Sequence, residues 1–130
     1  MKDAPPQTIY LADYQPPAFL IDKVHLTFRL DPEKTRVLSK IEFRPNPASQ
    51  KGEFFLHGED LKLIRATVDG RPVALRMREG GLSCDVPDAA FTWEAEVEIA
   101  PAANTALEGL YMSNGMYCTQ CEAEGFRKIT

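Results

Sequence analysis

"FTWEAEVEI", residues 91–99, is the stretch that decides the fold. Apolar side chains occupy every second position, and threonine or glutamate occupies the positions between them. A period of two places the apolar residues on one face of a β-strand and the polar residues on the other. The apolar face consists of Phe91, Trp93, Ala95, Val97 and Ile99. The stretch therefore predicts a strand with one face in a core and the other in water.

The same alternation recurs upstream in segments that turn residues separate. It is clear in "VHLTFRL" (24–30) and "TRVLSKIEF" (35–43), on either side of a turn at "DPEK". "LKLIRATV" (61–68) runs into Asp69-Gly70, which is a strong signal for a two-residue hairpin turn. Shorter strands are expected in "EFFL", "RPVALRMR" and "LSCDV". Because no helical period of useful length precedes residue 100, these strands predict antiparallel sheets.

The 130 residues are expected to form one all-β domain, an antiparallel β-sandwich or saddle of about seven or eight strands within residues 21–100. Residues 1–20, which contain Pro5, Pro6, Pro16 and Pro17, are expected to form an extended arm. Alternation is lost in residues 101–130, which are predicted to be a long irregular segment. Such a long loop in a compact domain is usually functional, so function is sought there.

The composition argues against several classes of function. A net charge of −4 with scattered Lys and Arg residues gives no basic surface for nucleic acid. No apolar run approaches the length of about 20 residues that crosses a bilayer, so no membrane association is expected. The start of the chain lacks the pattern of a secretory signal, and three cysteines, an odd number, suit a reducing compartment. We therefore expect a cytoplasmic protein.

Cys118 and Cys121 form a C-x-x-C pair, which is half of a common zinc pattern. The remaining candidate ligands, Cys84, His25 and His57, stand alone in the predicted strand region without a partner at ligand spacing. A redox pair is equally disfavoured, because that motif begins a helix in a strand-helix-strand unit. We expect two reduced thiols, a core cysteine at position 84 and two surface histidines. Without H-E-x-x-H or G-x-S-x-G, no catalytic and no metal-binding residue is expected.

Gln120 and Glu122 are the candidate binding residues. If "TQCE" is extended, their side chains project to the same side and bring an amide oxygen and a carboxylate together. Such a pair suits an ammonium group, which a carboxylate about 4 Å away attracts by about 4 kcal/mol at an effective dielectric of 20, before desolvation. The alternative is that Glu122 is a solvated loop charge or pairs with Arg127. Spacing alone favours that alternative.

Three stretches resemble the amino-terminal domain of the bacterial aminopeptidase N family, the zinc-dependent alanyl aminopeptidases of the gluzincin type. They are "YLADYQPPAFLIDKVHLTFRLDPEKTRV" (10–37), "LHGEDLKLI" (56–64) and "APAANTALEGLYMSNGMYCTQCEAEGFRKIT" (100–130). The resemblance implies an antiparallel β-saddle that packs on a thermolysin-like catalytic domain of the same polypeptide. It also implies that Gln120 and Glu122 reach into the active site, where Glu122 holds the α-ammonium group at the amino terminus of a peptide substrate and Gln120 lines the pocket.

The resemblance places the catalytic equipment of the family outside these residues. Its zinc is held by two histidines of H-E-x-x-H and a glutamate further along, and the glutamate of that motif is the general base. None of these motifs occurs in the chain, so the resemblance implies an isolated amino-terminal domain, truncated before the catalytic domain and inactive alone. The parent protein is expected to be a zinc metalloaminopeptidase, and this part of it is expected to hold no zinc.

A second hypothesis from a different class is a stand-alone β-sandwich module that captures an amine or a protein partner through its carboxylate-bearing loop. The two hypotheses differ in the surface that they predict. A domain that packs on a catalytic domain exposes a large apolar patch when that partner is absent. A stand-alone module has a polar, self-contained surface.

Overall fold

Ten strands and three short 3₁₀ helices make up the part of the chain that the computed structural model describes, residues 6–130. A five-stranded antiparallel sheet has the order β1-β2-β8-β4-β5 and is built from β1 (Phe19–Arg29), β2 (Thr35–Pro45), β8 (Phe91–Ile99), β4 (Lys62–Val68) and β5 (Arg71–Pro72). A second sheet, of order β3-β7-β6, is built from β3 (Phe55–His57), β7 (Gly81–Ser83) and β6 (Arg76–Arg78). The predicted all-β fold with antiparallel strands is confirmed.

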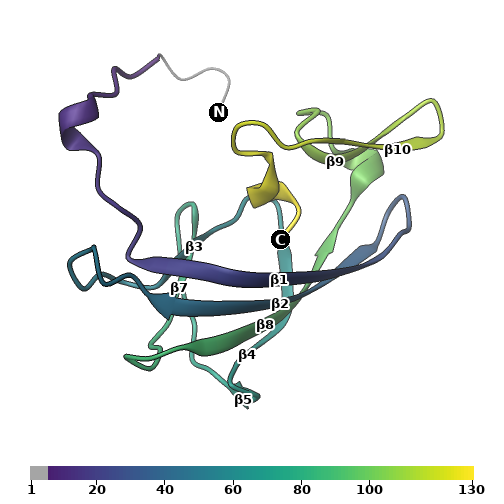
Figure 1. Ribbon diagram of the computed structural model, residues 1–130. Helices are drawn as coiled ribbons and strands as arrows, with labels where there is room; N and C mark the ends of the chain where they lie inside the picture. Colours follow the sequence, from purple (N-terminus) through teal and green to yellow (C-terminus); the bar gives the residue numbers. More distant parts are fainter. Residues whose placement is uncertain (1–5) are drawn as a thin grey trace.

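The 3₁₀ helices are η1 (Leu11–Asp13), η2 (Pro101–Ala103) and η3 (Gly125–Lys128), and a separate hairpin consists of β9 (Gly109–Ser113) and β10 (Met116–Gln120). Figure 1 shows the arm leaving β1 at one end of the large sheet, while the β9–β10 hairpin stands near the opposite end. Residues 6–18 lack strand structure, as expected for the arm, and contain η1. Residues 1–5 of the predicted arm lie outside the described residues.

Alternation in β8 and β2 positions the core on one face of the large sheet. Phe43 lies opposite Phe91, Ile41 opposite Trp93, and Val37 opposite Val97, so their side chains share that face. Phe54, just before β3, closes the core from the second layer: its ring centroid lies 4.9 Å from Phe43 and 5.1 Å from Phe91. A second cluster forms where Leu110 and Ile129 pack on the other end of the sheet. The predicted buried face of residues 91–99 is confirmed.

The opposite face of the large sheet is charged. Arg36 on β2 lies between two glutamates of β8, with its guanidinium 2.5 Å from Glu96 and 3.1 Å from Glu98. These side chains occupy the polar positions of the alternating pattern, so the sheet is apolar on one side and ionic on the other. The ion pairs also hold β2 and β8 in their observed register.

Strand β1 differs from its prediction in one respect. It forms as predicted, and Val24, Leu26 and Phe28 face the core side, because their partners in the ladder are Ile41, Ser39 and Val37. Val24 nevertheless remains 51% exposed and Phe28 39% exposed. Alternation identifies the face of a strand, but burial requires a second layer, and in residues 6–130 that layer covers β2, β8, β4 and Phe19 at the start of β1, but not Val24 or Phe28.

The prediction of an irregular segment for residues 101–130 is wrong over part of its length. Met116 pairs with Ser113 at the start of a five-residue antiparallel ladder, which leaves Asn114 and Gly115 as a two-residue loop. Both have positive φ, at 50° and 77°, the geometry in which Asn-Gly closes a hairpin. The Asp69-Gly70 turn between β4 and β5 has the same geometry, with φ of 51° and 77°, and confirms the predicted hairpin.

Asp31 closes the turn between β1 and β2 and gives the fold a measurable pH dependence. Its carboxylate accepts the backbone N–H groups of Glu33 and Lys34, each at 2.9 Å. The hydrogen bond from Glu33 is the main cause, and that from Lys34 the next, of a pKa for Asp31 below its ordinary value of 3.8. A lowered pKa contributes stability that is present above pH 3.8 and is lost as the pH falls through the native value.

We expect the urea midpoint of the wild-type chain to fall more between about pH 6 and about pH 3 than that of Asp31→Asn. Asparagine keeps an acceptor oxygen for the turn but has no charge to titrate. Equal losses in the two proteins would show that Asp31 is not part of the acid response.

Candidate functional site

The candidate site begins where β10 ends. Gln120 is the last residue of β10 and pairs with Gly109 of β9. Beyond it the chain turns back on itself, because the N–H of Gly125 donates to the carbonyl of Cys121 at 2.8 Å. Two close backbone approaches make this turn compact. A Cβ on Gly125 would overlap the carbonyl oxygen of Gln120, and a Cβ on Gly109 would lie 3.1 Å from the carbonyl oxygen of Gly125.

The extended geometry considered for "TQCE" ends at Gln120, and Glu122 lies in the turn beyond the strand. One hydrogen bond links the two residues. The side-chain amide of Gln120 donates to the main-chain carbonyl of Glu122 at 3.1 Å, which leaves its own oxygen available as an acceptor. Glu122 is exposed, the peptide bond that follows it is cis, and in residues 6–130 its carboxylate has no hydrogen-bond or ion-pair partner. The unpartnered carboxylate of Glu122 and the free amide oxygen of Gln120 are two acceptors on one short segment, and such groups suit a cationic donor.

Arg127, the expected alternative partner of Glu122, is engaged elsewhere. Its guanidinium lies 3.4 Å from Glu124 and 3.9 Å from Glu59. Of the two alternatives for Glu122 that spacing left open, the structure shows the solvated charge and not the Arg127 pair. The carboxylate is therefore free to take a partner from outside the chain.

A second group of charges lies behind the candidate site, between η3 and the turn that joins β3 to β4. The ammonium group of Lys128 lies 2.9 Å from Asp60 and 3.3 Å from Glu59. The pKa of Lys128 is raised above its ordinary 10.5, chiefly by the hydrogen bond to Asp60 and further by that to Glu59, while partial burial acts in the opposite direction. The sequence analysis missed this group, because Asp60 and Lys128 lie 68 positions apart in the chain.

The cysteines and histidines lie where the sequence predicts. Cys84 is buried, and burial raises the pKa of its thiol. Cys118 and Cys121 are free and partly buried, and His25 and His57 are exposed. Within residues 6–130, no three His, Cys, Asp or Glu side chains are grouped so that they could hold a metal ion. The described residues therefore do not fit a zinc centre, and no chemistry of a metal is assigned to them.

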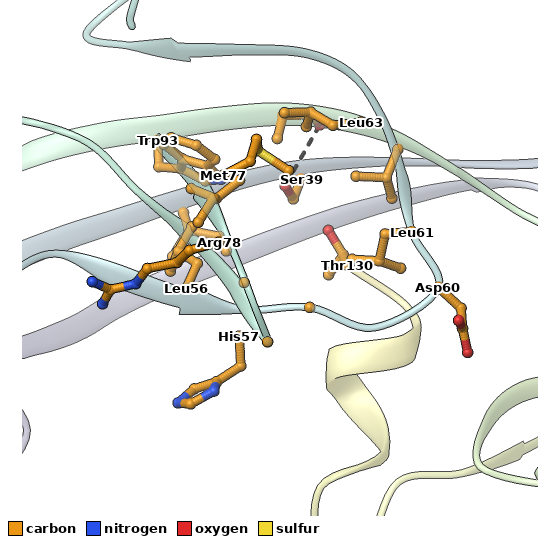
Figure 2. Close-up of a pocket in the computed structure, with 17 residues that line it drawn as sticks. Ser39, Leu56, His57, Asp60, Leu61, Leu63, Met77, Arg78, Trp93 and Thr130 are labelled. Carbon is orange, nitrogen blue, oxygen red and sulfur yellow. Dashed lines mark hydrogen bonds between the residues drawn. The ribbon is translucent and has the colours of Figure 1, made fainter. Parts of the chain in front are cut away.

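A cavity of about 230 Å³ lies between the large sheet and the second layer. Its walls are mostly apolar, with Trp93, Leu56, Leu61 and Leu63 among them. Figure 2 shows the charged end of Arg78 and the ring of His57 directed away from these side chains. Neither Gln120 nor Glu122 lines it, so the cavity is separate from the candidate site.

No helix in residues 6–130 has both the length and the apolar character needed to pass through a bilayer.

Comparisons with known proteins point to one family. The chain is 45% identical to aminopeptidase N of Caulobacter vibrioides over all of its length, and 44% identical to aminopeptidase N of Escherichia coli over 96% of its length. It is 36% identical to aminopeptidase N of Haemophilus influenzae over 93% of its length. The chain spans only about 15% of the length of these relatives. No protein-family model matches it.

A solved structure supports the fold. The chain superposes on Legionella pneumophila aminopeptidase A, solved in complex with aspartic acid, with a TM-score of 0.81. The match covers 92% of this chain and 15% of that protein. At 22% identity it establishes the shared β architecture alone.

Proposed function

The chain belongs to the aminopeptidase N family as an amino-terminal domain, and we propose that it serves a zinc-dependent enzyme that removes N-terminal amino acids from peptides. Its own part in the reaction is to hold the free α-ammonium group of the substrate. The observation that carries this proposal is the exposed Glu122 carboxylate, which has no partner within residues 6–130, on a residue whose main-chain carbonyl accepts the Gln120 amide.

The chemistry of an exopeptidase explains why such a group is needed. The enzyme must recognise the end of a peptide, and the end differs from the interior by one positive charge. A carboxylate at a fixed position binds a free ammonium group favourably. A blocked amine carries no charge, so it leaves the carboxylate without a partner and binds less well. Gln120 adds a neutral acceptor oxygen to the same place. Glu122 therefore sets the position of the substrate and takes no part in proton transfer.

The zinc ion and the general base are assigned to another part of the polypeptide. The described histidines and cysteines do not form a group that fits a metal, so none of them is a proposed ligand. Glu122 does not line any of three well-formed cavities in residues 6–130, and we assign the rest of the substrate pocket to another domain.

The partner of the chain is proposed to be the catalytic domain of the same polypeptide. Large apolar residues of the arm, of β1 and the residue after it, and of the segment after η2 are more than half exposed, and we infer that the catalytic domain covers part of them. They include Ile9, Leu11, Ile21, Val24, Leu30, Leu107, Met116 and Phe126. This exposure disfavours the stand-alone binding module, for which a polar surface was expected. A cytoplasmic location is proposed on the three free cysteines.

Glu122→Gln tests the proposal in an enzyme that carries this chain as its amino-terminal domain. Loss of a sheltered charge partner costs about 2–5 kcal/mol, so we expect kcat/KM for free-amine peptides to fall by about 30-fold or more, mainly through KM. The zinc content is expected to stay the same. The measurement is steady-state kinetics on an alanyl chromogenic substrate, with metal analysis of both proteins.

Glu124→Gln is the matched control, because Glu124 is exposed in the same segment and pairs with Arg127. An exposed ion pair contributes little, so its kinetics are expected to stay within about twofold of wild type. Unchanged kinetics in Glu122→Gln, or equal losses in both variants, would rule out the anchoring role.

A further inference from the structure

We propose that Lys128 and the Glu59-Asp60 turn form a clamp that fixes the position of Glu122, so that Lys128 is a positioning residue for substrate binding. This inference rests on the proposed anchoring function. The clamp consists of Lys128, Glu59 and Asp60, together with the backbone carbonyl of Arg127. It joins two segments that have no strand pairing with each other.

The segment that carries Glu122 needs external support. Between the end of β10 and the start of η3 it contains two described hydrogen bonds of its own, from the Gln120 amide to Glu122 and from the Gly125 N–H to Cys121. Glu122 itself is exposed. A loop with few contacts is held in place by its ends. One end is the β9–β10 ladder, and the other is η3.

The clamp holds the η3 end. The N–H of Glu59 donates to the carbonyl of Arg127 at 2.7 Å, and the ammonium group of Lys128 lies 2.9 Å from Asp60 and 3.3 Å from Glu59. The Lys128 side chain is 12% exposed, whereas Glu59 is 41% and Asp60 86% exposed, so the ammonium group is sheltered while water still screens its partners. Ile129, the next residue, is buried in the second core cluster and anchors the same end from the other side.

A short path connects the clamp to Glu122. A Cβ on Gly109 would lie 2.8 Å from the Cβ of Lys128, so the first side-chain carbon of Lys128 packs directly on Gly109. Gly109 pairs with Gln120 in the β9–β10 ladder, and the Gln120 amide holds the Glu122 carbonyl. Release of Lys128 therefore loosens both the ladder end and the turn at Gly125 that place the carboxylate.

Amide hydrogen exchange of this chain tests the clamp directly. In Lys128→Met, which keeps the apolar stem and removes the charge, exchange of the Gly125 amide, which donates to the Cys121 carbonyl, is expected to accelerate about tenfold, with β2 and β8 unchanged. Asp60→Asn is the second variant. Asp60 has φ of +58°, and asparagine tolerates that left-handed conformation while it removes the charge. Lys51→Met is the control, since Lys51 pairs with Asp88 at 3.5 Å on the open surface.

Kinetics of the enzyme that carries the chain then test the link to Glu122. A positioning role predicts that Lys128→Met raises KM about tenfold in the wild-type background and changes it less than twofold in the Glu122→Gln background. A merely structural role predicts that Lys128→Met raises KM by the same factor in both backgrounds. That result, or unchanged exchange in both clamp variants, would overturn the inference.

The two proposals fail in distinguishable ways. If Glu122→Gln alone leaves KM unchanged, the anchoring function is wrong, and so is the kinetic consequence of the clamp. Hydrogen exchange still decides whether the clamp orders residues 121–126, because it involves no substrate. Faster exchange in Lys128→Met and Asp60→Asn supports the clamp, and wild-type exchange in both overturns it.

Discussion

Replacing Phe54 by alanine is expected to lower the free energy of unfolding of this chain by about 3–5 kcal/mol. Phe54 is 3% exposed, and its ring lies 5.2 Å from Phe19 and 5.8 Å from Trp93, besides its contacts with Phe43 and Phe91. It is the side chain through which the second layer closes on the large sheet. Its loss leaves a cavity that the edges of several rings surround, and two strand layers cannot collapse to fill it.

Urea unfolding followed by far-UV circular dichroism measures this effect. Fluorescence of Trp93, the one tryptophan in the sequence, reports on the same core. Phe28→Ala is the control, because Phe28 belongs to the core-side row of β1 but remains 39% exposed. Its expected cost is about 1–2 kcal/mol, in proportion to the smaller area that it buries and without an enclosed cavity. Similar losses for Phe54 and Phe28 would mean that the second layer does not close on the sheet as described.

The same comparison shows what alternation predicts and what it leaves open. In β8 the period of two identifies both the strand and its buried face. In β1 it identifies the strand and the face, but not burial, because burial depends on whether another segment covers that face. The sequence of one strand contains no information on that second condition. The exposure of Val24 could be found only from the arrangement of the layers.

The Asp-Gly and Asn-Gly dipeptides are reliable turn signals in both places where they occur in the sequence. Asp69-Gly70 predicted a hairpin that the structure contains, and Asn114-Gly115 closes one that the prediction of an irregular segment overlooked. The strands on either side of Asn114 alternate weakly, with Met112 and Ser113 before it and Met116 and Tyr117 after it. The Asn114-Gly115 dipeptide is therefore a better indicator of this hairpin than the alternation of its two strands.

The candidate site was predictable in part. Gln120 and Glu122 lie close in sequence, and a short extended segment was enough to suggest that they act together. Whether Glu122 is free depends on Arg127, which pairs with Glu124 three positions earlier and with Glu59 in the turn before β4. The Glu124 pair has a local spacing that the sequence analysis did not weigh, whereas the Glu59 contact is a product of the fold and leaves no local pattern.

Replacing Gly125 by alanine is expected to displace Glu122 and to reduce kcat/KM by about 100-fold in an enzyme that carries this chain. A Cβ at this position would overlap the carbonyl oxygen of Gln120, and would also lie 3.0 Å from the Gln120 carbonyl carbon and 3.1 Å from the Gly109 nitrogen. All three are backbone atoms of a paired strand, so no side chain can rotate to relieve the contact. The segment must move as a whole, and a misplacement of about 1 Å can cost about that factor in rate.

Gly115→Ala separates this steric effect from the ordinary cost of replacing glycine. Gly115 lies in the β9–β10 hairpin with φ of +77°, and a Cβ there meets no atom within 4 Å. The variant therefore costs about 1–2 kcal/mol of backbone strain but does not push on Glu122. We expect its kcat/KM and zinc content to match wild type, whereas Gly125→Ala loses activity at unchanged zinc content. Wild-type kinetics for Gly125→Ala would mean that the position of Glu122 does not limit substrate binding, because the overlap with Gln120 cannot be avoided without moving it.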